Sequence, residues 1–214
     1  MQSVTLKVSH LKAALVCAAT KDIRYYLNAV LLEVRKRDTL LVSTDGHRLS
    51  VIHAATVAQD EPDNVPAQII IPREVLKGLK SENRRDDTCT LQHDPAKPES
   101  ECRISGIVGG DRVFVPIDAK FPDYTRVIPA TVNGERAVFD PALLAEFLDV
   151  VRIISGNSRA FYHLHENSDS SAIIQCAEAP EFLGVVMPMR WGAEEYKRPE
   201  WLDEKRDEEQ AIAA

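Results

Sequence analysis

The chain has 214 residues, of which 28% are charged and 44% are hydrophobic, so it can bury the core of one or two domains. Its formal net charge of -7 excludes a globally basic coat for nucleic acid but leaves room for a locally basic face. The charge is uneven, because residues 191–214 carry eight acidic and four basic side chains, a net of -4.

The N-terminus and the cysteines indicate a cytoplasmic protein. Residues 1–10 lack the basic region and apolar run of a signal peptide. No stretch approaches the roughly 20 apolar residues needed to span a bilayer. The cysteines show no C-x-x-C spacing, so we expect reduced thiols rather than a disulfide or a zinc site. They are Cys17, Cys89, Cys102 and Cys176.

One local pattern recurs three times along the chain. Each copy begins with a short apolar strand, predicted at residues 4–8, 68–71 and 136–139. A helix start follows each strand, with an N-cap or a first-turn proline. These starts are Ser9, Pro72, and Asp140 with Pro141. Apolar residues then recur at spacings of three and four, which predicts an amphipathic helix in each copy.

Three strands are predicted after each helix. They are rich in β-branched residues and are separated by turn residues. They span residues 27–34, 39–44, 48–56, 88–93, 102–108, 112–118, 159–165, 172–178 and 182–189. The helix starts lie 63 and 68 residues apart, so the sequence predicts an α+β fold of three β-α-β-β-β modules. One helix and one sheet cannot bury both faces, so modules are expected to pack in pairs or arrays.

These modules define the predicted domains. Residues 1–120 form a domain of two modules, and residues 121–134 form a proline-containing linker. Residues 135–190 form a single third module. Residues 191–214 are an exposed charged tail.

The segment 43–51 is the most specific local string. Asp45-Gly46 is a turn signal, and His47-Arg48 follows it before a strand. Three readings are open: a turn held by its own side chains, a binding surface built from this turn, or an acid/base pair of Asp45 and His47. Residues two apart in a tight turn rarely point at one substrate atom, which disfavours catalysis.

Two further motifs each allow a structural and a functional interpretation. His163 and His165 would share one side of a strand and, with Glu166, could bind a metal, but surface histidines are the alternative. In residues 184–190, two methionines flank Pro188, which marks a strand end. This segment is either a core strand that ends there or an adaptable apolar contact surface.

The charge of the predicted helices differs. Segment 7–21 has a net charge of +3, segment 72–87 has +1, and segment 140–152 has -2. The first two could approach phosphates without reading a base sequence, whereas the third is poorly suited to this. The candidates to face DNA are Lys7, Lys12, Lys21, Arg24, Arg73, Lys77, Lys80 and Arg84.

Four strings, at residues 22–34, 44–51, 121–129 and 185–190, together resemble the bacterial sliding clamp, the DNA polymerase III beta subunit. The resemblance runs over residues 1–190. It implies a ring of repeated β-α-β-β-β modules whose helices line a DNA channel. It also implies a non-catalytic processivity factor that needs no cofactor.

The resemblance further implies a cleft that binds short linear peptides of polymerase, clamp loader and repair proteins. Its apolar residues would hold peptide anchors, and its polar residues would form the rim. Carried over by motif, the cleft residues are Leu27, Thr44, Gly46, His47, Arg48, Leu49, Pro122, Arg126, Val127, Val185, Val186, Met187, Pro188, Met189 and Arg190.

Departures from the family pattern also shape the expectations. The family has three domains of two modules, whereas this chain matches the middle domain and the last half of the final one. The usual dimer interface would then be largely missing, and a ring of twelve modules would need four copies. The tail is the other departure: Trp191, Trp201 and Leu202 are hypothesised to fold back into the cleft or to contact another subunit.

Three functional hypotheses follow. The first is a sliding-clamp homologue that binds clamp-motif peptides and double-stranded DNA without sequence specificity, with self-association possible and no membrane contact. The second is a peptide-binding decoy or regulator of the host clamp that forms no ring. The third, more remote, is a small hydrolase or metal enzyme using Asp45 and His47, or the pair His163 and His165.

Overall fold

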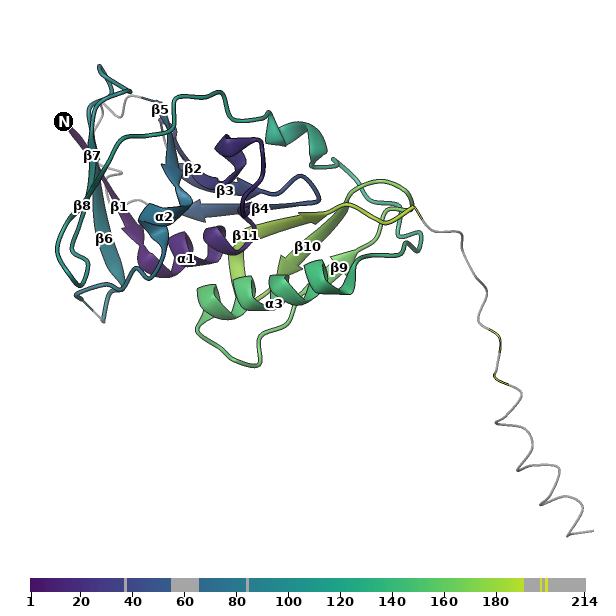
Figure 1. The fold of residues 1–214 in the computed structure, drawn as a ribbon. Helices are drawn as coiled ribbons and strands as arrows, with labels where there is room; N and C mark the ends of the chain where they lie inside the picture. Colours follow the sequence, from purple (N-terminus) through teal and green to yellow (C-terminus); the bar gives the residue numbers. More distant parts are fainter. Residues whose placement is uncertain (37, 55–65, 84, 191–196, 198, 200–214) are drawn as a thin grey trace, which may run out of the picture.

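The computed structural model describes residues 1–36, 38–54, 66–83, 85–190, 197 and 199. In this part of the chain a four-stranded sheet, sheet A, has the order β1-β6-β7-β8 (Figure 1). Its strands are β1 (Gln2–Lys7), β6 (Thr88–His93), β7 (Cys102–Ser105) and β8 (Arg112–Phe114). None of the helices described is long and apolar enough to cross a membrane.

A seven-stranded sheet, sheet B, has the order β5-β2-β3-β4-β11-β10-β9. Its strands are β2 (Ala29–Val34), β3 (Thr39–Thr44), β4 (Arg48–Ala54), β5 (Ala67–Pro72), β9 (His163–His165), β10 (Ala172–Cys176) and β11 (Ala179–Val186). The helices are α1 (Val8–Val16), α2 (Arg73–Leu76), α3 (Pro141–Ser155) and the 3-10 helices η1 (Tyr25–Leu27) and η2 (Tyr124–Val127). The predicted α+β fold of repeated modules is confirmed.

The first two modules exchange their first strands. β1 of the first module pairs with β6 of the second, and β5 of the second pairs with β2 of the first, both antiparallel. The three strands that follow each helix form an antiparallel meander. Each meander therefore gains a fourth strand from its neighbour, so neither module completes its sheet alone.

The third module joins the first through their last strands. β11 runs antiparallel to β4, with Val185 opposite Leu49 and Val186 opposite Arg48. This pairing makes sheet B continuous across the two modules. Leu49 and Val185, which lie opposite each other at this seam, both line one cavity.

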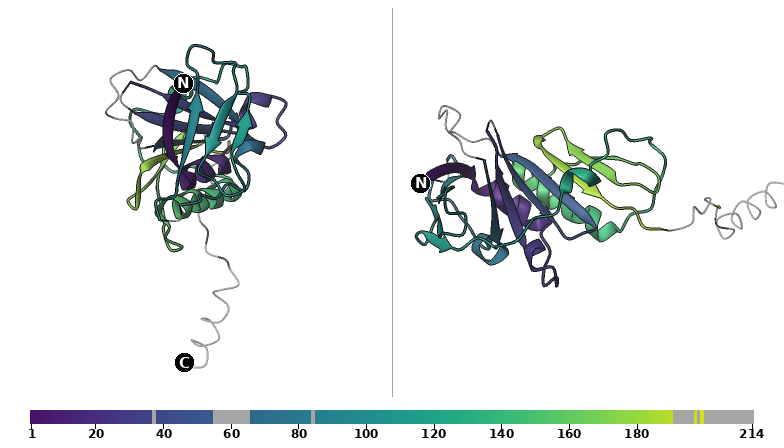
Figure 2. Two further views of the ribbon diagram at one scale, coloured as in Figure 1. Left: turned by 90° about the vertical axis from the view of Figure 1, so that its left-hand side faces the viewer. Right: turned by 90° about the horizontal axis from the view of Figure 1, so that it is seen from above.

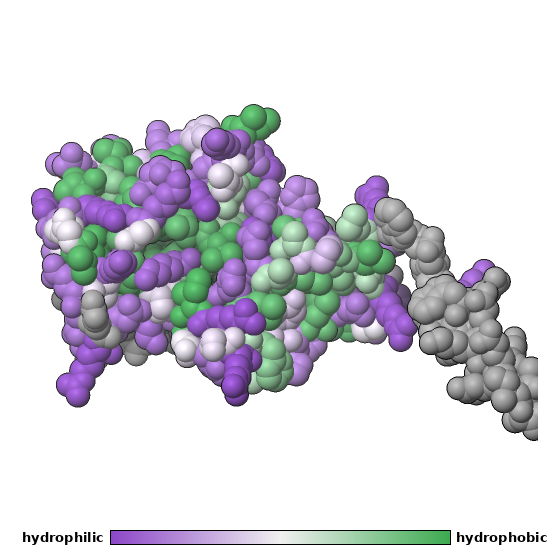
Figure 3. Space-filling view, turned by 60° about the horizontal axis from the view of Figure 1, so that its bottom comes forward, coloured by the Kyte–Doolittle hydropathy of each residue, from purple (hydrophilic) through white to green (hydrophobic). Residues whose placement is uncertain are grey.

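Helices cover one face of sheet B, and α1 and α3 pack side by side there (Figures 1 and 2). The main hydrophobic core lies between these helices and the sheets. A second cluster lies on the other face of sheet B, where Phe121 and Tyr124 of the linker are buried. The first half of the linker therefore packs on the sheet. When the α3 side is turned forward, hydrophobic side chains gather over the third module (Figure 3).

The predicted helix starts agree with the structure for α3 but not for α1. The start of α3 is confirmed, because the Asp140 carboxylate accepts a hydrogen bond from the Ala142 N–H and Pro141 is the first residue. For α1 the predicted N-cap is wrong. The helix begins at Val8, and Ser9 lies in its first turn, where its N–H donates to the Asp87 carboxylate at 2.8 Å.

The second helix is much shorter than predicted. α2 ends after one turn at Leu76, and Gly78 follows with a φ of +66°. Leu79 is buried although it lies outside the helix. The apolar spacing predicts helical periodicity, but residues 77–81 form an irregular segment that brings Leu79 to the core. This segment ends in a bridge between Ser81 and Ile107.

The first strand predicted for the third module is also wrong. Residues 136–139 form no strand and make one isolated bridge, between Val138 and Met189. In the other two modules this strand pairs with a neighbouring meander. The described part of the chain offers the third module no such neighbour, so its first segment lacks a ladder.

Candidate functional site

A cleft of about 230 Å³ opens at the seam between β4 and β11. Leu49 and Val185, which pair across the seam, belong to the second cluster, so the cleft lies on the sheet face opposite α1 and α3. Four separate segments line it. The lining residues are Arg24, Leu27, Thr44, Gly46, His47, Arg48, Leu49, Pro122, Asp123, Tyr124, Val127, Val185 and Met187.

The cleft has an apolar floor and partly apolar edges. Leu27, Leu49 and Val185 are buried, whereas Met187 and Val127 are about 40% exposed. The Met187 N–H donates to the His47 carbonyl at 2.9 Å, which fixes the chain just after β11 beside the turn. An apolar side chain from a ligand can therefore bury itself against the floor and displace water from Met187 and Val127.

The turn at residues 44–48 is held by its own side chains. The Asp45 carboxylate accepts hydrogen bonds from the N–H groups of His47 and Arg48, at 2.9 and 3.0 Å. The Thr44 hydroxyl donates to the Arg48 carbonyl and accepts from the Gly46 N–H. Because Asp45 is used in this way, the turn presents the exposed His47 at the cleft without forming an acid/base pair with it.

Gly46 is required by both conformation and contact. Its φ is +94°, and a Cβ built on it would lie 3.0 Å from an Nη atom of Arg24. Arg24 is held across this glycine by two hydrogen bonds to Asp22, at 3.0 and 2.7 Å, and one to the Asp45 carbonyl. Hydrogen bonds from Arg24 lower the pKa of Asp22 to about 2, so this anchor stays ionised at neutral pH.

Arg24, one of the residues expected to face DNA, lies in the lining of the cleft. The signal was available in the sequence, because Arg24 precedes Leu27 within the same recognised string. Its contact with Gly46 joins segments 22 residues apart in sequence, which local patterns do not reveal.

Arg48 lies beneath the cleft wall and is only 7% exposed, not on the rim as predicted. Its guanidinium pairs with Asp45 at 3.0 Å, with Glu146 of α3 at 2.6 Å, and donates to the Val16 carbonyl of α1 at 3.1 Å. It therefore ties the turn to both helices on the other side of the sheet.

The opposite wall comes from η2 in the linker. The Tyr124 hydroxyl donates to the Glu33 carboxylate and accepts from Arg35 at 2.8 Å. Burial, and then this bond to Glu33, raise the pKa of Tyr124 to about 12, so the hydroxyl remains a donor. Asp123 caps η2 by accepting from the Thr125 N–H. Asp123 and Tyr124 were not predicted, although both lie in the string at residues 121–129.

Ten of the fifteen predicted cleft residues line this cavity, and five do not. Val186 follows Val185 on β11 and therefore points to the opposite face, where it is buried in the main core. The other four are outside the lining: Arg126, Pro188, Met189 and Arg190. Met189 instead pairs with Val138. Trp191, Trp201 and Leu202, proposed to fold back, lie outside the described residues.

The histidine pair does share one side of β9, as its spacing predicts. His163 and His165 line a second cavity of about 340 Å³ with Cys176 and Phe182. Within the ranges that the structure describes, no group of three His, Cys, Asp or Glu side chains is placed to hold a metal ion. The four cysteines are free and buried.

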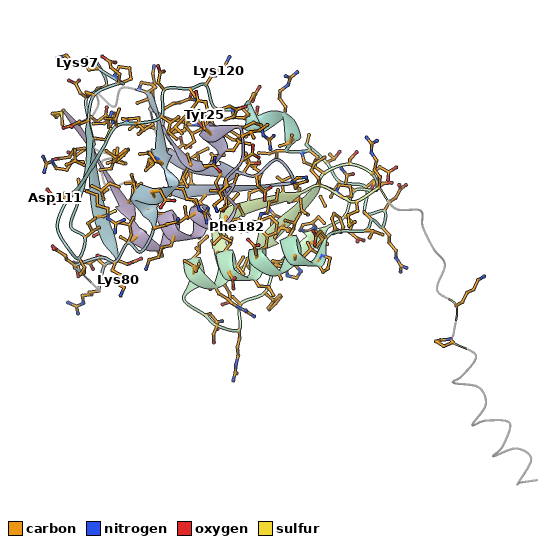
Figure 4. All side chains as sticks on the ribbon, in the orientation of Figure 1. Tyr25, Lys80, Lys97, Asp111, Lys120 and Phe182 are labelled. Carbon is orange, nitrogen blue, oxygen red and sulfur yellow. The ribbon has the colours of Figure 1, made fainter. Side chains whose placement is uncertain are left out.

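The basic residues predicted to face DNA are divided among different environments. Arg73 donates to the carbonyls of Leu15 and Ala18 at the end of α1, and Lys77 pairs with Glu74. Lys7, Lys21 and Lys80 are exposed, Lys12 is half-buried, and Arg84 lies outside the described residues. Tyr25, beside Arg24, and Lys80 lie on opposite sides of the molecule in Figure 4.

Comparisons with known proteins agree with this architecture. The family model described as "DNA polymerase III beta subunit, central domain" matches residues 5–123. The chain is 36% identical over 148 residues to the beta sliding clamp of Pseudomonas putida, covering 64% of this chain and 35% of that protein. The Escherichia coli beta sliding clamp is 32% identical over 114 residues, covering 52% of this chain and 28% of that one.

Solved structures show the same fold. The DNA polymerase III subunit beta of Pseudomonas aeruginosa matches with a TM-score of 0.64 and 22% identity, covering 89% of this chain and 66% of that one. The beta subunit of Thermotoga maritima matches with a TM-score of 0.60 and 18% identity, with the same coverage. The chain thus spans about a third of the length of the curated relatives it matches.

Proposed function

Because the chain belongs to the family of the DNA polymerase III beta subunit, the beta sliding clamp, we propose that it is a non-catalytic clamp homologue whose cleft binds short linear peptides. The peptides would come from polymerase, clamp loader and repair proteins in the cytoplasm. One observation carries the proposal: residues from the recognised strings, far apart in the sequence, line one apolar cavity.

The cleft suits a peptide anchor better than a small-molecule substrate. At about 230 Å³ it is smaller than the 300–1,000 Å³ typical of ligand pockets, so it would take one or two side chains. Leu27, Leu49 and Val185 would bury an apolar anchor. Arg24 and His47 at the edge would donate to peptide carbonyls or to an acidic side chain.

The two methionines after β11 provide a matched test. Met187 lines the cleft, whereas Met189 is outside it, and their exposed fractions are 41% and 44%. A fluorescently labelled clamp-motif peptide would be titrated with the wild type, Met187→Ala and Met189→Ala. We expect Met187→Ala to weaken binding about tenfold, equivalent to about 1.4 kcal/mol. Met189→Ala should stay within about twofold of the wild type, since a side chain outside the contact contributes little. Equal affinities for all three proteins would refute the cleft assignment.

A second candidate function is that of a decoy or regulator. It is favoured because basic residues expected to face DNA have partners within the protein. Arg24 and Arg73 are engaged in internal contacts, and α3 exposes Asp149 on the helix side, while its Glu146 pairs with Arg48. Such a protein would bind the peptide but not remain on circular DNA. Gel filtration of the protein loaded on nicked plasmid distinguishes the two: retention supports a DNA clamp, and peptide binding without retention supports the regulator.

A further inference from the structure

The third module contains a segment that corresponds to β5 of the second module, but this segment lacks a strand to pair with as β5 pairs with β2. In the second module the Ile117 N–H donates to the Ile70 carbonyl at 3.0 Å, and in the third the Met189 N–H donates to the Val138 carbonyl at 2.7 Å. Val138 is therefore the counterpart of Ile70. Ile70 pairs with Leu31 of β2 and is 4% exposed, whereas Val138 is 43% exposed.

The first meander strand of the third module is also open on one side. Leu91 of β6 pairs with Ile104, as Leu164 of β9 pairs with Ile174, so β9 is the counterpart of β6. On its other side β6 pairs with β1, where Val4 lies opposite Leu91. β9 is the last strand of sheet B in the described chain, and no strand occupies that position.

The flank of α3 beside this edge is apolar. Glu146 faces α1, since it pairs with Arg48, which also bonds to the Val16 carbonyl. At 100° per residue, Leu144 and Leu148 lie on nearly the opposite side of the helix. Pro141 and Ala145 adjoin them, and Arg152 is the one charged residue there. Hydrophobic side chains also gather over this module in Figure 3.

We propose that two copies of this chain pair through their third modules, with residues 136–139 of each copy adding to β9 of the other. The first two modules show this exchange of first strands within one chain. The third module contains both elements that the exchange requires, a first segment and an open first meander strand. A two-fold axis would satisfy both at once and bring the Leu144–Leu148 flanks of the two α3 helices together.

A second copy fits this surface in register as well as in topology. Val4 opposite Leu91 places the corresponding Ala137 opposite Leu164, and so Val138 opposite His163 of the other copy. Val138 and His163 are both exposed. Because the flank carries a single charge, copies related by a two-fold axis meet little like-charge repulsion there. The cleft lies on the other face of sheet B and stays open.

Cross-linking tests the register. Directly opposite residues of an antiparallel pair have Cα atoms about 4.5–5.5 Å apart, within the roughly 4.4–6.8 Å that a disulfide spans. The double variant Val138→Cys/His163→Cys should give a covalent dimer on a non-reducing gel after mild oxidation, and dithiothreitol should reverse it. The matched control Val138→Cys/Val113→Cys, which uses the edge strand β8 of sheet A, should give no covalent dimer on the gel, because β8 lies outside the proposed contact and the native cysteines are buried.

Mass measurement tests the surface without engineered thiols. Light scattering at micromolar concentration should give the wild type twice the chain mass of 23.9 kDa. Val138→Lys and Leu148→Glu should each give monomers that keep the wild-type circular dichroism spectrum and peptide affinity. Val113→Lys should remain a dimer. A monomeric wild type, or a dimer lost only with Val113→Lys, would overturn the proposal.

Discussion

Arg48 and Glu146 form a 2.6 Å ion pair that joins the turn under the cleft to the helix of the third module. The acidic character of that helix argued against a DNA-facing role, and here one of its acids has a structural partner. The same guanidinium pairs with Asp45 and donates to the Val16 carbonyl, so one buried cation contacts both the first and the third module. The shape of the cleft therefore depends on the contact between these modules.

Substituting Glu146 should loosen this junction. Glu146→Ala removes one partner of a buried guanidinium, and because Glu146 itself is 46% exposed we expect a loss of about 1 kcal/mol in the free energy of unfolding. Asp149→Ala on the same helix, whose exposed side chain has no ion pair among those described, is the control and should change stability by less than half as much. Urea denaturation of both variants measures the difference. Equal effects would mean that the pair contributes nothing to the junction.

Two glycines with the same backbone conformation allow the effect of backbone strain to be distinguished from the effect of a contact with Arg24. Gly46 and Gly109 have φ values of +94° and +96°, but only at Gly46 would a Cβ meet another atom, 3.0 Å away on Arg24. Gly46→Ala and Gly109→Ala should each lower stability by about 1–2 kcal/mol, since alanine is strained at positive φ. Gly46→Ala alone should also weaken peptide binding several-fold, because it displaces Arg24. Anisotropy titration beside thermal melts checks both effects, and similar affinities for the two variants would contradict this role of Arg24.

Local signals in the sequence correctly predict those features that are determined by residues close together along the chain. Asp140 with Pro141 starts α3 because the cap and the proline act within one helical turn. Residues 136–139 were misread as a strand because a strand also needs a partner, and the sequence does not show that the module lacks one. Leu79 was misread for a related reason: burial at a spacing of three from Leu76 is compatible with both a helix and an irregular segment.

Ten of the fifteen predicted cleft residues line the cavity, and the misplaced residues have two different causes. Val186 was included with Val185, although strand alternation sends the two side chains to opposite faces. Arg48 was assigned to the rim because arginine is usually exposed, yet three partners hold it beneath the wall. The role of Arg24 depends on a contact with Gly46 across 22 residues. The placements of Arg48 and Arg24 are set by tertiary contacts that motif matching does not contain, whereas that of Val186 follows from the alternation of side chains along a strand.

The hydroxyl of Tyr124 should matter for the cleft more than that of Tyr162. Each hydroxyl makes a structural hydrogen bond, Tyr124 to Glu33 and Tyr162 to the Leu144 carbonyl, so replacing either tyrosine by phenylalanine should cost about 1 kcal/mol. Tyr124→Phe should in addition weaken peptide binding a few-fold, since η2 forms one cleft wall. Calorimetric melts and peptide titration measure the two quantities. A loss of affinity with Tyr162→Phe alone would place the binding site elsewhere.

The pH dependence of stability should report on His10, which lies buried on α1 and contacts Glu181 of β11 at 3.2 Å. Burial, followed by the charge of Lys7, holds the pKa of His10 below its ordinary value of 6.5, although Glu181 opposes the shift. The unfolded chain therefore binds a proton at this site more readily than the folded chain. This contribution to stability is complete above pH 6.5 and is lost as the pH falls below it.

The wild type should accordingly melt at a lower temperature at pH 5.5 than at pH 7.5, and His10→Gln should reduce that difference. His93 is buried with its pKa lowered in the same direction, so His93→Gln should reduce it as well. His47→Gln, at an exposed position of the turn, controls for the replacement of a histidine by glutamine as such. Differential scanning fluorimetry at the two pH values gives the comparison. If His10→Gln retains the full wild-type difference, Glu181 compensates for burial and the contact between α1 and β11 is not pH-sensitive.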